Sequence, residues 1–306
     1  MYLEHFALRE LPFSITPDTS YFFNNTGHQE AMNVLLVALR SGEGFIKISG
    51  EVGTGKTLLC RRLLNLLSVD KHFVTAYIPN PYLSPAALTM ALAEELDIDC
   101  PRDIGQHRAL KLITDHLIAL TAKGKRVVLM IDEAQAMPEQ SLEALRLLTN
   151  LETEKYKLLQ IVLFGQPELD NILAKPSVRQ FRQRIAFSYT LPSMDCEGVK
   201  AYVAHRLVVA GYGGAPMFAD KAMNVLCRAS RGVPRLVNII AHKALMAAYG
   251  QGARTIQVQH VRAAVADTED ANLYSRKRIG WPRYVWLGMA VSAIASGAWF
   301  FLRVAQ

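Results

Sequence analysis

Residues 50–57 read Gly-Glu-Val-Gly-Thr-Gly-Lys-Thr and match G-x-x-x-x-G-K-T, the pattern of a phosphate-binding P-loop. The short apolar run 45–49 precedes this loop, and apolar residues with helical spacing follow it over 58–64. A strand, a glycine-rich loop and a helix start in this order direct backbone N–H groups and the positive end of a helix dipole at a polyphosphate. We therefore expect ATP to be bound by Gly50, Glu51, Val52, Gly53, Thr54, Gly55, Lys56, Thr57 and Leu58. Lys56 would reach the β and γ phosphates, and the Thr57 hydroxyl would ligate Mg²⁺.

Two carboxylates follow an apolar run further along the chain. Residues 126–131 have the continuous apolar character of a parallel strand that is buried on both faces, and Asp132 and Glu133 come directly after it. Downstream of a P-loop this arrangement is a Walker B pattern. We expect Asp132 to hold Mg²⁺, directly or through water, and Glu133 to orient and polarise the attacking water.

Polar residues also occur at the ends of two further elements. Gln166 follows the apolar run 158–164 and lies beside Asp132 if the two strands are neighbours, where its side chain could contact the γ-phosphate or the water. A residue that caps the loop explains Gln166 equally well. Arg235 follows Pro234 at the start of a predicted helix and could fold over the nucleotide, or it could be a surface arginine at a helix end.

Three arginines, Arg179, Arg182 and Arg184, precede the predicted strand 185–191. Such a cluster is usually solvated charge. In an oligomeric ATPase, one of these arginines would reach the neighbouring subunit's site and neutralise transition-state charge, an effect of roughly 10³ to 10⁵ in rate. The spacing does not decide which arginine has this role.

The order of predicted elements changes once along the chain. Apolar patterns predict strands at 45–49, 73–78, 126–131, 158–164 and 185–191, with helices at 28–40, 58–64, 85–95, 106–122 and 138–152. Only helices follow, at 195–210, 218–230, 233–249 and 258–266. Alternation followed by helices alone indicates a parallel-sheet α/β domain and then a small helical lid.

Composition divides the remaining segments. Residues 1–27 are rich in aromatic residues and in proline, including Pro17. We expect this segment to form a linker that wraps the core. One of its aromatic rings could stack on the adenine base, or the rings could serve only to pack the linker on the core. The predicted domains are therefore the linker 1–27, the ATPase core 28–192, the lid 193–270, a basic juxtamembrane linker 271–283, a membrane helix 284–302 and a short tail 303–306.

The segment 284–302 contains no charged residue. A helix of this length is roughly 28 Å long, close to the hydrocarbon thickness of a bilayer. Trp281 and Trp299 suit the two interfaces, and basic residues concentrate before the segment, with only Arg303 after it. We expect a C-terminal anchor in the bacterial inner membrane, with the ATPase domain in the cytoplasm and the tail in the periplasm.

The charge distribution speaks against nucleic acid as a partner. The net charge is +7, but residues 276–306 hold five basic and no acidic residues, which leaves 29 basic and 27 acidic residues in the rest of the chain. That nearly neutral body lacks the clustered cations that DNA binding requires. The four cysteines, Cys60, Cys100, Cys196 and Cys227, are far apart and form no metal-ligand pattern, so we expect reduced thiols in a cytoplasmic domain.

With these motifs in place, the chain resembles AAA+ ATPases of the general secretion pathway protein A family, and within it those of mannose-sensitive haemagglutinin pilus biogenesis. The resemblance covers residues 1–270 and is carried by 2–6, 12–18, 50–57, 131–135, 165–169 and 232–235. It implies homo-oligomers that work with inner-membrane secretion or pilus assembly proteins, sensor roles for Gln166 and Arg235, and a finger among Arg179, Arg182 and Arg184. Secretion-pathway members carry a periplasmic peptidoglycan-binding domain after the membrane helix, whereas this sequence stops there, so we expect a membrane partner to make any contact with the cell wall.

Three functions are compatible with these residues. A membrane-anchored ATPase would hydrolyse ATP to drive assembly of a pilus or secretion complex. A nucleotide-gated scaffold would bind ATP and partners with little hydrolysis. A DNA-acting ATPase is disfavoured by the neutral body and the expected anchor.

Overall fold

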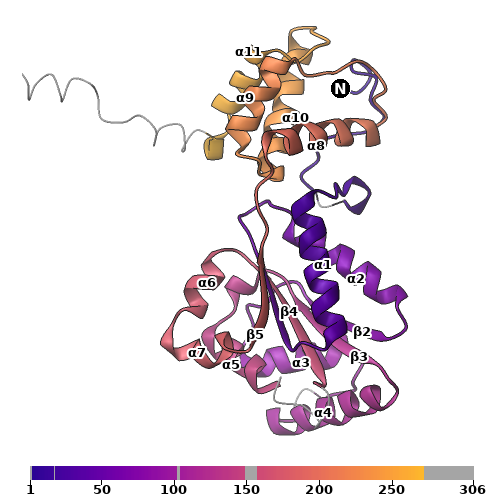
Figure 1. The fold of residues 1–306 in the computed structure, drawn as a ribbon, viewed down its shortest axis with the longest axis vertical. Helices are drawn as coiled ribbons and strands as arrows, with labels where there is room; N and C mark the ends of the chain where they lie inside the picture. Colours follow the sequence, from indigo (N-terminus) through magenta and orange to yellow (C-terminus); the bar gives the residue numbers. More distant parts are fainter. Residues whose placement is uncertain (1, 17, 102–103, 149–156, 272–306) are drawn as a thin grey trace, which may run out of the picture.

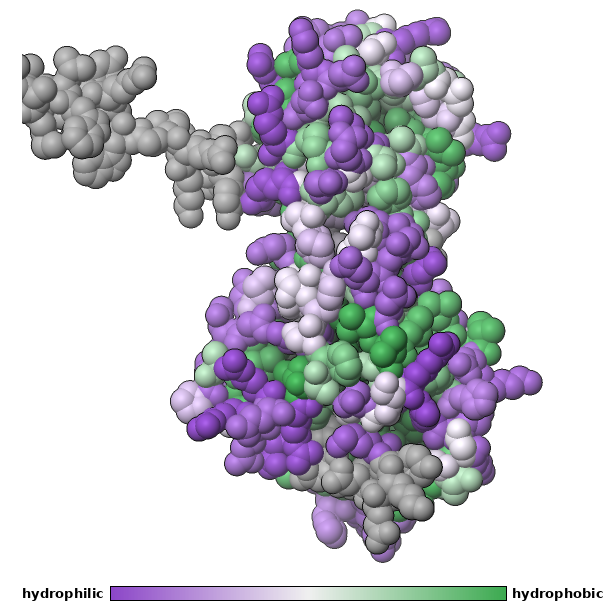
Figure 2. Space-filling view, viewed as in Figure 1, coloured by the Kyte–Doolittle hydropathy of each residue, from purple (hydrophilic) through white to green (hydrophobic). Residues whose placement is uncertain are grey.

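The computed structural model describes residues 2–16, 18–101, 104–148 and 157–271. Figure 1 shows an α/β core below and a helical lid above, with the N-terminus in the lid, and Figure 2 shows a narrow waist between the two units. The strands are β1 Phe45–Ser49, β2 Phe73–Ile78, β3 Arg126–Ile131, β4 Leu159–Gly165 and β5 Ile185–Thr190. The core helices are α1 Thr26–Ser41, α2 Lys56–Val69, α3 Pro85–Glu95, α4 Gln106–Ala122, α5 Glu139–Leu148, α6 Glu168–Leu173 and α7 Arg179–Arg182, and the lid helices are α8 Cys196–Val209, α9 Asp220–Ser230, α10 Pro234–Gly250 and α11 Val258–Ala266.

The five strands form one parallel sheet in the order β2-β3-β4-β1-β5. The three inner strands are buried along nearly their whole length, whereas β5, at an edge, alternates between half-buried and exposed residues. This agrees with the continuous apolar runs of the sequence, because strands covered on both faces need no polar side. All strands end at the same edge of the sheet, so the P-loop, Asp132 and Gln166 meet there.

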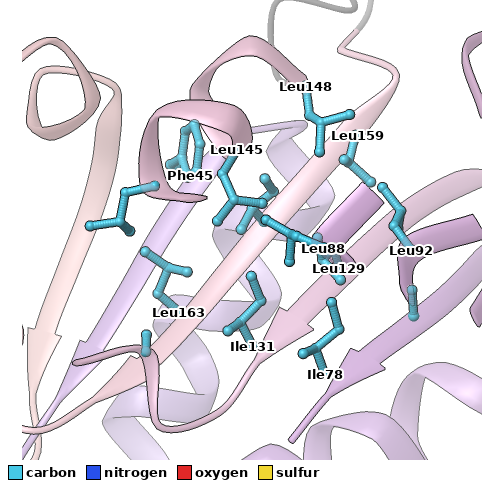
Figure 3. Packing of buried hydrophobic residues seen from close by; sticks show 14 of the residues in the cluster. Phe45, Ile78, Leu88, Leu92, Leu129, Ile131, Leu145, Leu148, Leu159 and Leu163 are labelled. Carbon is cyan, nitrogen blue, oxygen red and sulfur yellow. The ribbon is translucent and has the colours of Figure 1, made fainter. Parts of the chain in front are cut away.

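Each face of the sheet has its own hydrophobic core. On one face, Leu129 and Ile131 of β3 pack with residues of α3 and α5 such as Leu88 and Leu145, as Figure 3 shows. On the other face, the alternate β3 residue Met130 packs in a cluster with α1 and α2. Burial of one such side chain contributes roughly 1.5 to 3 kcal/mol, so the two clusters fix the register of the strands that carry the site.

Residues 2–13 pack in the lid, which corrects the prediction that the whole segment 1–27 wraps the core; only its end does so, where the Phe22 ring lies against His28 of α1 and the Arg62 guanidinium of α2. Tyr2, Phe6 and Phe13 are buried in one cluster with residues of α8, α9, α10 and α11. The Tyr2 hydroxyl lies 2.8 Å from Nδ1 of His242, and the Phe13 ring meets Phe218 edge to face. The aromatic residues signalled burial correctly, but no local pattern names a packing partner that lies about 200 residues away. Pro17 lies outside the described residues.

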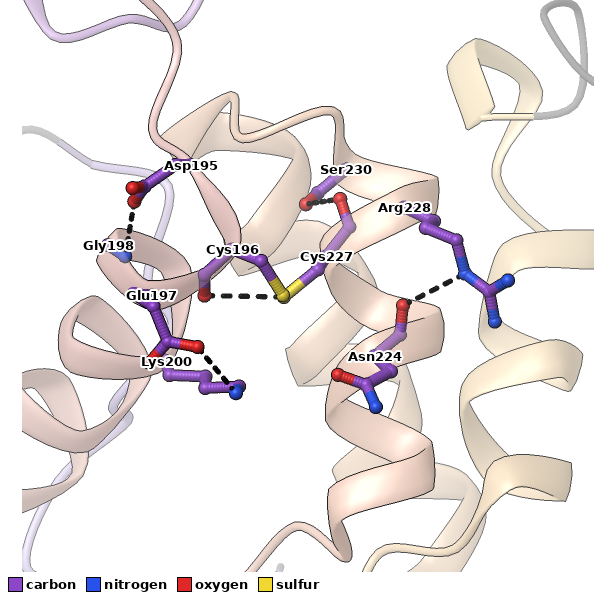
Figure 4. The surroundings of a disulfide bond; sticks show 9 residues. All are labelled: Asp195, Cys196, Glu197, Gly198, Lys200, Asn224, Cys227, Arg228 and Ser230. Atoms are coloured by element: carbon purple, nitrogen blue, oxygen red, sulfur yellow. Dashed lines mark hydrogen bonds and ion pairs between the residues drawn. A yellow bond between two sulfur atoms is a disulfide. The ribbon is translucent and has the colours of Figure 1, made fainter.

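A disulfide joins α8 to α9, which corrects the prediction of four reduced thiols. Cys196, the first residue of α8, is bonded to Cys227 near the end of α9, with Cα atoms 5.3 Å apart (Figure 4). The two cysteines are 31 residues apart and become neighbours only through helix packing, so their spacing gave no sign of the bond. Cys60 and Cys100 are free.

None of the helices in residues 2–16, 18–101, 104–148 and 157–271 is long and apolar enough to cross a membrane. The predicted membrane helix 284–302, the basic segment before it and the tail 303–306 lie outside the described residues.

Candidate nucleotide site

The P-loop connects β1 to α2 as the sequence predicts. Its turn is closed by Thr54, whose backbone N–H and side-chain hydroxyl both donate to the Glu51 carbonyl, at 3.3 and 2.8 Å. Gly55 precedes α2 with φ +97°, a left-handed conformation that favours glycine, and a Cβ there would lie 2.8 Å from Nε2 of His28. His28 of α1 therefore lies directly against the loop at Gly55, and the start of α2 faces the cleft.

Lys56 is a buried cation, 5% exposed, whose hydrogen bonds both go to backbone carbonyls. Its ammonium donates to Gly50 at 2.7 Å and to Glu51 at 2.9 Å. Burial lowers the pKa of Lys56, and the carboxylates of Glu133 and Asp132 oppose that shift. A desolvated ammonium held by neutral carbonyls can bind an anion such as a phosphate with little loss of its own hydration.

Asp132 lies below the loop, 2% exposed, at the end of β3. Burial raises the pKa of Asp132. Two hydrogen bonds act in the opposite direction and lower it, one from the Thr57 side chain and one from the Glu133 backbone N–H at 3.0 Å. A hydroxyl and a carboxylate in contact next to a phosphate cradle are the oxygen ligands that Mg²⁺ prefers. Thr57 and Asp132 therefore fit a magnesium ion, as the sequence indicates.

Glu133 is held by two glutamines at the mouth of the cleft. Its Oε2 accepts a hydrogen bond from Nε2 of Gln135 at 2.5 Å and another from Nε2 of Gln166 at 3.0 Å. Its backbone has φ 51°, a left-handed conformation that is uncommon outside glycine and is concentrated at functional sites. Since β3 and β4 are neighbours, Gln166 lies beside the acidic pair, as the sequence predicts for adjacent strands.

The lid contacts the P-loop directly through the start of α10. The backbone N–H of Arg235 donates to the Gly53 carbonyl at 3.2 Å, and a Cβ on Gly53 would lie 2.4 Å from the Arg235 Cβ. Arg235 lines the cleft together with Pro234. The structure therefore places this arginine over the site rather than on a free helix end.

Gly53→Ala should separate the loop from the lid, and Gly42→Ala is its matched control. Both glycines have φ +81°, a left-handed conformation that strains any residue with a Cβ, but a Cβ on Gly42 meets nothing within 4 Å. We expect Gly53→Ala to weaken ATP binding at least tenfold, about 1.4 kcal/mol, with Gly42→Ala within threefold of wild type. Titration calorimetry with a non-hydrolysable ATP analogue measures the difference. Equal affinities for the two variants would contradict the contact.

The cleft between core and lid has a volume of about 240 Å³. It is lined by Val52, Gly53, Gly55, Lys56, Thr57 and Leu58 of the P-loop region, by Glu133 and Gln166, by Tyr202, Arg206, Pro234, Arg235 and Asn238 of the lid, and by Ser14, Ile15, Thr16 and Asp18. Three residues near this lining contact the P-loop: the Gly50 carbonyl accepts from Lys56, the Thr54 hydroxyl donates to Glu51, and Asp132 accepts from Thr57. Glu51 lines an adjacent hollow with Arg235. The described aromatic residues of 1–27 are not among the lining residues, and the N-terminal segment reaches the cleft through Ser14, Ile15, Thr16 and Asp18 instead.

A buried polar cluster on the lid side was not predicted. Arg206 is 6% exposed and donates to the carbonyls of Pro12 and Ser14, at 2.5 and 3.3 Å. Tyr202 donates to Asn238 at 3.0 Å, and Asn238 donates to the Ser14 carbonyl at 3.3 Å. These contacts fix the backbone of Pro12 and Ser14 against the lid. The residues come from three distant segments, so only the polar character of Tyr202, Arg206 and Asn238 at positions on the buried faces of their helices could have marked them.

The three arginines before β5 do not reach the cleft. Arg179 and Arg182 are exposed on α7, and Arg184 is half-buried beside Ile185, which pairs with Phe45 at the start of β1. Because the P-loop follows the other end of β1, these arginines lie at the opposite edge of the sheet. They cannot complete the site within one chain, and a role in a neighbouring chain's site stays a prediction.

Comparison with known proteins agrees with this geometry. Residues 39–173 match the AAA domain family. Among solved structures, the fold resembles Drosophila ORC bound to DNA, with 17% identity over 86% of this chain and 65% of that chain and a TM-score of 0.63. It also resembles Cdc6p from Pyrobaculum aerophilum, with 19% identity over 82% and 70% and a TM-score of 0.62. At such identities the likeness concerns the fold. Fold, P-loop and domain match together define an AAA-type P-loop protein.

A relative covers almost the whole chain. Over 300 residues, 98% of the chain, the sequence is 41% identical to General secretion pathway protein A of Aeromonas hydrophila. The chain is thus related to General secretion pathway protein A over nearly its whole length and contains an AAA domain, which agrees with the coarser part of the resemblance stated above. The match covers 54% of the relative, so the chain spans about half of its length.

Proposed function

We propose that this chain binds ATP with Mg²⁺ and hydrolyses it to ADP and phosphate. The observation that carries the proposal is the meeting of a buried, carbonyl-held Lys56 with Thr57, Asp132 and Glu133 at one edge of the sheet. Magnesium would supply charge neutralisation of the phosphates, held by Thr57 and Asp132. Lys56 would bind the β and γ phosphates, and Glu133 would accept a proton from the attacking water.

Gln166 and Arg235 fit sensor roles in this proposal. Both line the cleft, one from the core and one from the lid. The Gln166 side chain contacts Glu133, and the Arg235 backbone contacts the P-loop, so each connects the nucleotide to a different part of the fold. The lid and the lining residues Ser14, Ile15 and Thr16 would exclude water from the reacting groups.

We further propose that the protein is an inner-membrane ATPase that supports assembly of a pilus of the mannose-sensitive haemagglutinin type or of a type II secretion-like complex. The relationship to General secretion pathway protein A supports the secretion class. The apolar segment 284–302 and the basic residues before it support a membrane anchor with the core in the cytoplasm.

Hydrolysis by the full chain, measured against protein concentration, tests this proposal. We expect specific activity to rise with concentration, because a finger from a neighbouring chain completes the site, and to fall at least a hundredfold when one of Arg179, Arg182 and Arg184 is changed to Ala. Alanine at the other two positions provides the matched controls. Tight ATP binding with no turnover at any concentration would overturn hydrolysis and support a nucleotide-gated scaffold.

A further inference from the structure

The side-chain amide of Gln135 contacts Glu133 and also a second element of the site. Its Nε2 donates to Oε2 of Glu133 at 2.5 Å, and its Oε1 accepts the backbone N–H of Gln166 at 2.9 Å. The residue lies in the short 3₁₀ helix Ala134–Ala136, directly after the acidic pair. One half-buried amide thus bridges the end of β3 to the end of β4.

The two contacts also determine which way the amide points. A backbone N–H can only donate, so the atom facing Gln166 must be the oxygen, and an ionised carboxylate can only accept, so the atom facing Glu133 must be the nitrogen. Only a group with one donor and one acceptor in this geometry satisfies both neighbours. Leucine has the size but neither function, and glutamate has the shape but lacks the donor.

Gln166 cannot replace Gln135 in this arrangement. The Gln166 side chain also donates to Glu133, through the same Nε2 with which it would contact a γ-phosphate. When that donor turns to a phosphate, the hydrogen bond from Gln135 is the one that keeps Glu133 in place. Its other contact is to the Gln166 backbone, which the side-chain movement does not disturb.

We propose that Gln135 is a positioning residue that fixes the Glu133 carboxylate and ties it to the backbone of Gln166. The inference rests on the proposed function, since it assigns Gln135 a part in the hydrolysis that Glu133 performs. Its contact with Glu133, however, can be tested without any hydrolysis.

The first test uses thermal unfolding of the full chain without nucleotide, at one neutral pH. Gln135→Glu places a carboxylate against that of Glu133 while Lys56 and Asp132 are unchanged, so we expect the unfolding temperature to fall by roughly 3 °C or more. Adding Glu133→Gln restores an amide opposite a carboxylate and should recover most of that loss. Gln106→Glu, the same charge change at an exposed position at the start of α4, is the control and should change the unfolding temperature little. No recovery in the double variant would overturn the contact.

The second test uses kinetics. We expect Gln135→Leu to lower kcat by 10 to 100-fold while KM for ATP and the affinity for ADP change less than threefold, because the residue orients the carboxylate and does not bind nucleotide. In the Glu133→Gln background, Gln135→Leu should add almost nothing. Parallel losses of kcat, ADP affinity and unfolding temperature would overturn the positioning role. If the wild type does not hydrolyse ATP, the proposed function fails, and the recovery experiment still decides whether Gln135 holds Glu133.

Discussion

Lys56→Met should abolish tight ATP binding in a protein that still folds. The ammonium is desolvated and donates to two backbone carbonyls near the carboxylates of Glu133 and Asp132, so methionine removes the phosphate-binding charge and the cost of burying it but leaves those acceptors without their donor. We expect the affinity for ATP to fall about a hundredfold, roughly 2.7 kcal/mol, and hydrolysis to become undetectable. Titration calorimetry measures the affinity, and thermal unfolding of the free protein measures the stability.

Lys47→Met provides the contrast, because Lys47 is also buried but is paired with Asp170. Its loss leaves a half-exposed carboxylate without its partner, so we expect a lower unfolding temperature with ATP binding retained. If Lys56→Met bound ATP as tightly as Lys47→Met, the P-loop would not be the nucleotide site.

Glu133→Gln should separate binding from hydrolysis. The amide keeps the size of the side chain, but it cannot accept a proton from water, so we expect kcat to fall by roughly 10² to 10⁴ with ATP affinity within about threefold of wild type. Rapid-quench turnover and equilibrium binding of the same preparation give the two numbers. Glu94→Gln, an exposed position at the end of α3, controls for the loss of one negative charge. Unchanged turnover in Glu133→Gln would falsify the assignment of the water-polarising residue.

The features that the sequence predicted well are those with a local physical cause. Strands 45–49, 73–78 and 126–131 have the predicted bounds, because each apolar run stops at a glycine, proline or aspartate that marks the end of the strand. The P-loop is recognisable from eight consecutive residues, 50–57, and the acidic pair from two, Asp132 and Glu133. Parallel strands then bring Gln166 to the same edge with no further information.

The features that it did not predict depend on contacts between distant segments. Arg206 lines the cleft because α8 packs on residues 12–14, and Cys196 meets Cys227 because α8 packs on α9. Neither contact leaves a periodic or compositional trace at either end. Gln135 was visible in the motif around the acidic pair, but its role depends on the direction of one amide, which only the positions of Glu133 and Gln166 reveal.

The placement of the N-terminal segment inside the lid also has a consequence for the order of folding. Tyr2 contacts a residue 240 positions later, and Pro12 one that is 194 positions later, so neither contact can form until the lid helices have been synthesised. The P-loop core has no such requirement, since its strands end at residue 190. Closing loops of this length is slow, because its cost in chain entropy is not compensated until the contacts form. Residues 2–13 are therefore among the last described residues to reach their native positions, although they precede the core in the chain, and the cleft acquires the wall formed by Ser14, Ile15 and Thr16 only when the lid is complete.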